Sequence, residues 1–76
     1  MTLGAWIKLK FHSQELLNNA LGLCKGRVNS YYNQDPKKLF MYVPQLSKFG
    51  DTPTSEIVKM IEQRCDDVKA RKSIDV

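Results

Sequence analysis

The chain has 76 residues and a formal net charge of +4, from 12 Lys or Arg and eight Asp or Glu. This length leaves room for one small hydrophobic core, so we expect a single domain over residues 1–76. Two cysteines are too few for the disulfide framework of a small secreted protein, and no apolar run approaches the ~20 residues of a membrane-spanning helix, so we expect no membrane partner.

The first eleven residues do not resemble a signal peptide, because Lys8 and Lys10 interrupt their apolar run. We therefore expect an intracellular, reducing compartment. In Ala5–Phe11 the residues Ala5, Ile7, Leu9 and Phe11 fall on one side of an extended chain, and this period of two predicts a strand. Trp6 then lies on the same outer side as the two lysines. A rigid aromatic outside the core is typical of an interface anchor, and we predict that Trp6 binds a protein partner.

The stretch from Ser13 to Tyr32 is amphipathic and predicts the central helix. Ser13 suits the N-cap of a helix, and apolar residues recur at three- and four-residue spacing through Leu17, Leu21, Cys24, Val28 and Tyr31. Gly22 and Gly26 each cost a helix interior ~1 kcal/mol relative to Ala. They leave open a helix that ends at Gly26, but the continued apolar spacing favours one continuous helix.

The next apolar segment, Leu39–Val43, can be read in two ways. It is short and lies between Pro36 and Pro44, as a buried strand does. Asp35 followed by Pro36 also suits a helix N-cap with proline at the first helical position. We predict a strand.

The remaining residues predict a loop followed by a second long helix. Pro44–Thr54 contains Pro, Gly and Ser, which favours a loop. A new helix is expected after Thr52-Pro53, with an apolar stripe formed by Ile57, Met60, Ile61, Cys65 and Val68. We expect residues 73–76 to form a frayed C-terminal tail.

The predicted order is strand, helix, strand, loop, helix, which corresponds to a small α+β domain with two helices covering a small sheet. A two-stranded sheet is thin, so this fold would gain from pairing across a homodimer. The alternative is an all-α fold of four short helices, in which both predicted strands are helical.

No arrangement of residues in the sequence indicates catalysis, a metal or another cofactor. His12 is the single histidine and has no evident nucleophile partner. His12, Cys24 and Cys65 lack the close spacing of structural zinc ligands. The segment Gly22–Arg27 lacks the Gly-Lys-Ser/Thr ending of a phosphate-binding loop. We therefore predict that the protein is not an enzyme.

The positive charge is concentrated in the first half of the chain. Residues 1–38 carry six Lys or Arg against two acidic residues, whereas residues 39–76 carry six of each. Basic side chains neutralise nucleic-acid phosphates, and tyrosine rings stack on unpaired bases. We predict a site for single-stranded or structured RNA or DNA formed by Lys8, Lys10, Lys25, Arg27, Tyr32, Lys37 and Lys38. These lysines can equally form an ordinary solvated surface. The alternative function is a regulatory protein–protein interaction module, an adaptor or inhibitor acting as a homodimer.

Overall fold

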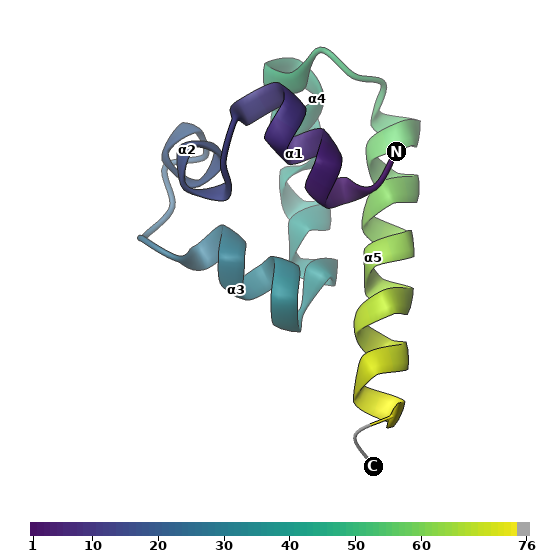
Figure 1. Ribbon diagram of the computed structural model, residues 1–76. Coiled ribbons are helices and arrows are strands. Elements are labelled where there is room, and N and C mark those ends of the chain that lie inside the picture. The colour runs from purple at the N-terminus through teal and green to yellow at the C-terminus, as the bar shows by residue number, and fades with distance from the viewer. Residues whose placement is uncertain (75–76) are drawn as a thin grey trace.

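The computed structural model of the protein describes the backbone of residues 1–74 and the side chains of residues 1–71. Its elements are α1 (Leu3–Phe11), α2 (Gln14–Ala20), α3 (Arg27–Gln34), the 3-10 helix η1 (Pro36–Tyr42), α4 (Val43–Gly50) and α5 (Thr54–Ile74) (Figure 1). The described residues contain no strand, so the predicted α+β class is wrong. The all-α alternative has the correct class, but it expected four helices where the described chain forms five α-helices and η1.

The predicted first strand, Ala5–Phe11, is part of α1. Thr2 caps this helix, because its hydroxyl oxygen accepts a hydrogen bond from the backbone N–H of Ala5 at 3.2 Å. The buried face consists of Leu3, Trp6 and Ile7, which is helical spacing. The alternating pattern was misleading because it counted Leu9 among the core residues, whereas this side chain is 60% exposed.

The predicted continuous helix from Ser13 to Tyr32 is two helices. The N-cap at Ser13 is confirmed, because its hydroxyl accepts from the N–H of Leu16 at 3.1 Å. However, α2 ends at Ala20, and both Gly22 and Gly26 have positive φ angles, of 70° and 82°. Such angles favour glycine and are incompatible with a continuing right-handed helix.

A buried asparagine holds the connection between α2 and α3. The amide group of Asn18 donates to the carbonyls of Leu23 and Cys24, both at 2.9 Å, and its oxygen accepts from the N–H of Val28 at 3.0 Å. Asn18 is 3% exposed. One side chain therefore satisfies three backbone groups of the turn, which gives the chain an alternative to helical hydrogen bonding.

The predicted second strand, Leu39–Val43, lies in η1 and the first residue of α4. Pro36 and Pro44 each stand in the first turn of a helix, where a missing N–H costs nothing. The prolines therefore begin helices where we expected them to bound a strand. For the same reason most of the predicted loop Pro44–Thr54 is helical, within α4.

The second long helix is confirmed as α5. It lies along one side of the molecule and packs against α1, α3, η1 and α4 (Figure 1). Its residues Ile57 and Ile61 have no exposed surface. The backbone of residues 73 and 74, predicted as part of a tail, belongs to α5, and residues 75–76 lie outside the described residues. Within the described residues, no helix has both the length and the hydrophobicity to cross a membrane.

Trp6 belongs to the core, so the expectation that it is an exposed anchor is wrong. It is 2% exposed, and its indole Nε1 donates to the hydroxyl of Thr52 at 3.0 Å. The ring meets Phe11 edge-on, with 5.5 Å between ring centroids, and lies directly against Gly50. The tryptophan thus ties α1 to the end of α4 and to the turn before α5.

Candidate functional site

A groove of about 740 Å³ lies where the junction of α3 and η1 meets α5. The residues that line it are Gln34, Asp35, Pro36, Lys37 and Lys38 from the junction and Cys65, Asp66, Val68 and Lys69 from α5. Pro36 is buried and begins η1, and the N–H of Lys38 donates to the carbonyl of Asp35 at 3.1 Å. This tight turn places two consecutive lysines at the groove.

Three lysines and two aspartates give the groove an excess of positive charge. Lys37 and Lys38 come from one wall, and Lys69 comes from the other. In the described part of the chain, none of these three ammonium groups forms an ion pair. The Lys38 ammonium lies over the ring of Tyr31, 5.6 Å from the centroid. That contact is a weak cation–π interaction at an exposed site and leaves the charge able to reach an anion.

Cys65 lines the same groove and remains a neutral thiol. Its pKa is raised, mainly by burial and then by the negative charges of Asp35 and Asp66, while Lys37 acts in the opposite direction. A nucleophilic cysteine requires a lowered pKa, because the thiolate is the reactive form. The raised pKa of Cys65 therefore disfavours the reactive thiolate form in this groove.

The structure brings together only part of the predicted nucleic-acid site. Lys37 and Lys38 share the groove, but Lys10 lines a different hollow beside α1, and Lys25 lines a third between α2 and α3. The side chains of Lys8 and Arg27 are exposed on α1 and α3, and neither lines the groove. Lys69 lines the groove with Lys37 and Lys38, and it was not among the residues predicted for the site.

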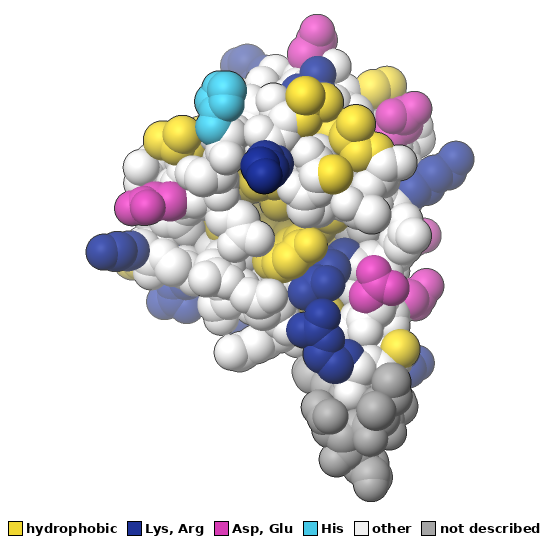
Figure 2. All heavy atoms as spheres, in the orientation of Figure 1, with side chains coloured by type: hydrophobic (Ala, Val, Ile, Leu, Met, Phe, Trp, Pro, Cys, Tyr) yellow, Lys and Arg dark blue, Asp and Glu magenta, His cyan; other side chains and the backbone are white. Residues whose placement is uncertain are grey.

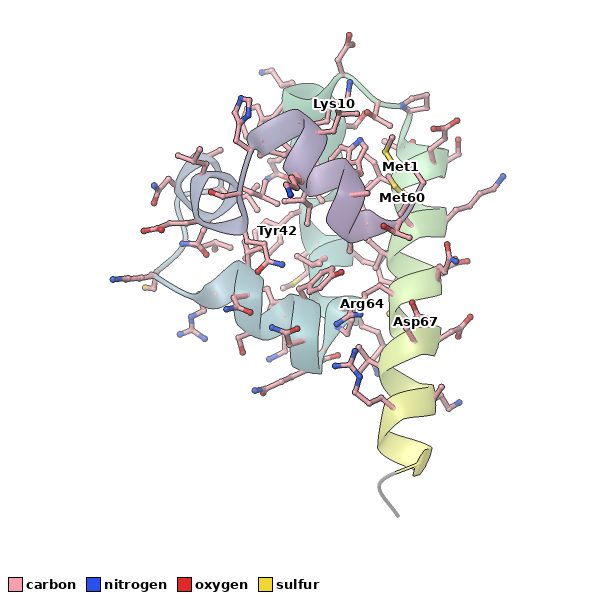
Figure 3. All side chains as sticks on the ribbon, viewed as in Figure 1. Met1, Lys10, Tyr42, Met60, Arg64 and Asp67 are labelled. Carbon is pink, nitrogen blue, oxygen red and sulfur yellow. The ribbon has the colours of Figure 1, made fainter. Side chains whose placement is uncertain are left out.

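Tyr32 is committed to contacts within the protein. The guanidinium of Arg64 covers one face of its ring, at 3.9 Å from the centroid, and the Nε of Arg64 donates to the Tyr32 carbonyl at 2.8 Å. The phenol tip packs closely against Gly4 of α1. Arg64 reaches from α5 towards α3 (Figure 3). A base cannot stack on this ring face without displacing the guanidinium.

The described residues hold no group of three or more His, Cys, Asp or Glu side chains that could bind a metal. Cys24 is exposed in the α2–α3 connection and Cys65 is on α5, and both are free thiols. Comparison of the chain with protein-family profiles, curated proteins and solved structures finds no match, so a functional assignment rests on the groove itself.

Proposed function

We propose that the protein is a non-catalytic module that binds nucleic-acid phosphates in the groove between η1 and α5. The observation that carries this proposal is the presence of three lysines, Lys37, Lys38 and Lys69, on two facing segments, none of which forms an ion pair with a described residue. Lysine binds phosphate as a point charge and releases condensed counterions when it does so. The volume of about 740 Å³ lies in the ~300–1,000 Å³ range of typical ligand sites.

The two acidic residues of the groove fit a nucleic acid better than a free phosphate ion. Asp35 and Asp66 leave a surplus of one positive charge among the groove side chains, which supports modest affinity for an isolated anion. Their carboxylates can accept hydrogen bonds from sugar hydroxyls or from base amino groups. A nucleotide chain supplies both these donors and several phosphates.

The proposal is tested by salt-dependent fluorescence anisotropy with a labelled single-stranded RNA of about 12 nucleotides, and with the duplex of the same length. Three phosphate contacts predict that log K falls with log salt with a slope of about −2 for a single strand and about −3 for a duplex. In the variant Lys37→Gln/Lys38→Gln/Lys69→Gln, we expect at least tenfold weaker binding and a slope close to zero.

A control variant with the same change in net charge keeps the experiment specific. Lys8→Gln/Lys25→Gln/Arg27→Gln removes three exposed basic side chains outside the groove. We expect it to bind as the unmodified protein does. Equal weakening in both triple variants would mean that charge acts diffusely, and no binding of either nucleic acid at low salt would refute the proposal.

Covalent labelling locates the bound ligand independently of charge. Cys65 lines the groove, whereas Cys24 is exposed elsewhere. A saturating oligonucleotide should slow the alkylation of Cys65 and leave that of Cys24 unchanged. Binding without this selective protection would place the nucleic acid at another surface.

A further inference from the structure

The carboxylate of Asp35 lines the lysine groove and has no structural task among the described residues. Asp35 stands at the N-cap of η1, where an aspartate side chain commonly accepts a hydrogen bond from the first turn. Here it makes no capping bond, and it forms no ion pair with a described residue. The backbone alone holds it, because its N–H donates to the carbonyl of Tyr31 at 3.0 Å and its carbonyl accepts from the N–H of Lys38 at 3.1 Å. The groove therefore contains a half-buried carboxylate whose oxygens are open to a ligand.

This carboxylate lies near Cys65 of α5, on the other wall of the groove. Burial raises the pKa of Cys65, and Asp35 is the negative charge that raises it most. Lys37 acts on the pKa of the same thiol in the opposite direction, so its ammonium is also close. The apolar part of the lining consists of Cys65 with the buried Pro36 and Val68. One nucleotide can therefore place its phosphate at the ammonium and the edge of its base at the carboxylate.

A carboxylate in this position suits one base better than the other three. Its two oxygens only accept hydrogen bonds. The Watson–Crick edge of guanine carries two neighbouring donors, N1–H and the 2-amino group. Adenine, cytosine and uracil each carry a single donor group there, next to an acceptor that a carboxylate repels. Unpaired bases of a single strand expose this edge to a protein.

We propose that Asp35 selects an unpaired guanine in the bound strand by accepting hydrogen bonds from its N1–H and 2-amino groups, while the groove lysines hold the flanking phosphates. The inference rests on the proposed binding of nucleic acid in the groove. Asp66 lines the groove as well, but it is exposed, so water competes more strongly for its hydrogen bonds.

Fluorescence anisotropy with labelled single strands that differ in one base tests the inference. The strands are oligouridines of about 12 nucleotides with guanine, inosine or adenine at one central position. We expect the guanine strand to bind about tenfold more tightly than the adenine strand, the effect of one good two-bond contact to a base. The base of inosine lacks only the 2-amino group of guanine, so its strand should bind with intermediate affinity.

The variant Asp35→Asn separates base selection from charge. Its amide has one acceptor oxygen, and its NH₂ group then faces the second guanine donor. The preference for guanine over adenine should fall from about tenfold to about one. Binding of the adenine strand should not weaken, because a negative charge has been removed from the groove. Asparagine also suits an N-cap, and circular dichroism checks that the variant remains folded.

Asp67→Asn is the matched control, because it makes the same change in charge outside the groove. Asp67 is exposed and lines a different hollow together with Arg64. Figure 2 shows both basic and acidic side chains over α5, and Figure 3 places Arg64 and Asp67 on this face. We expect this variant to keep the preference for guanine.

The outcomes distinguish this inference from the proposed function. Equal, salt-dependent binding of the guanine and adenine strands would overturn the inference and leave the proposed function intact. A guanine preference that survives in Asp35→Asn would also overturn it. So would tight competition by guanosine monophosphate, which carries one phosphate for three lysines and would make a free nucleotide the ligand. No binding of any strand at low salt would refute the proposed function and this inference together.

Discussion

Replacement of Asn18 by alanine should destabilise the protein far more than replacement of its neighbour Asn19. The Asn18 side chain makes three hydrogen bonds to the backbone groups of Leu23, Cys24 and Val28, and it is 3% exposed. Each such bond contributes about 1 kcal/mol, and the N–H of Val28 is left buried without its partner. We expect the free energy of unfolding to fall by about 3 kcal/mol, a large part of the 5–15 kcal/mol typical of a small domain.

This loss should lower the midpoint of thermal unfolding by about 12–24 °C, because 1 kcal/mol shifts a domain of this size by ~4–8 °C. Circular dichroism at 222 nm, the helical band, follows the transition, and urea unfolding gives the free energy. Asn19 is exposed, so Asn19→Ala should change stability by less than about 0.5 kcal/mol. A loss below about 1 kcal/mol in Asn18→Ala would show that water or a rearranged turn replaces the three bonds, and it would refute the assigned role.

Asn18→Asp adds a pH dependence of known sign. A carboxylate can still accept from the N–H of Val28, but it faces two carbonyl oxygens that have lost their donors. Folding therefore favours the protonated acid and raises its pKa above the ordinary ~3.9. The variant should be most stable at acidic pH relative to the unmodified protein and should lose stability as the pH rises through the raised pKa. A difference that does not change with pH would contradict this account.

Two further predictions concern the tryptophan contact and the thiols. Gly50→Ala places a Cβ 2.5 Å from Cζ2 of Trp6, and the hydrogen bond to Thr52 already holds this ring. The free energy of unfolding, measured by urea denaturation, should therefore fall by about 1–3 kcal/mol. An unchanged midpoint would mean that the ring moves freely. Iodoacetamide at about pH 8 should alkylate the exposed Cys24 before Cys65, because Cys65 is partly buried and its pKa is raised, and peptide mass mapping over time checks the order. Equal rates would show that the thiol of Cys65 is more accessible than its position indicates.

Local signals in the sequence predicted the start of α2 and the last helix, α5. The hydroxyl cap at Ser13 and the apolar stripe after Thr52-Pro53 depend on residues close together in the chain, and both are present in the structure. The errors arose where a segment is too short for its period to be decisive. Ala5–Phe11 contains Leu9, which fits an alternating pattern yet faces water. Only the packing of α1 on α5 shows that this segment is a helix and not a strand.

The break between α2 and α3 has a local signal in the sequence, the two glycines of the connection. Gly22 and Gly26 are four residues apart, and both adopt left-handed angles. The role of Asn18 was not predictable, because its partners face it only after the chain has turned. Of the three groove lysines, the sequence predicted Lys37 and Lys38 as site residues but not Lys69. No pattern within α5 indicates which of its residues lie beside η1.

The contact between Trp6 and Thr52 joins residues 46 positions apart in the chain. During synthesis, α1 leaves the ribosome long before the segment that covers its tryptophan, and the apolar face of Leu3, Trp6 and Ile7 must wait for α4 and α5. The turn held by Asn18 spans only ten residues and can close early. Burial of the first helix is therefore a late step in the synthesis of this chain. Nascent chains that stop before α5 expose an apolar surface that chaperones can bind.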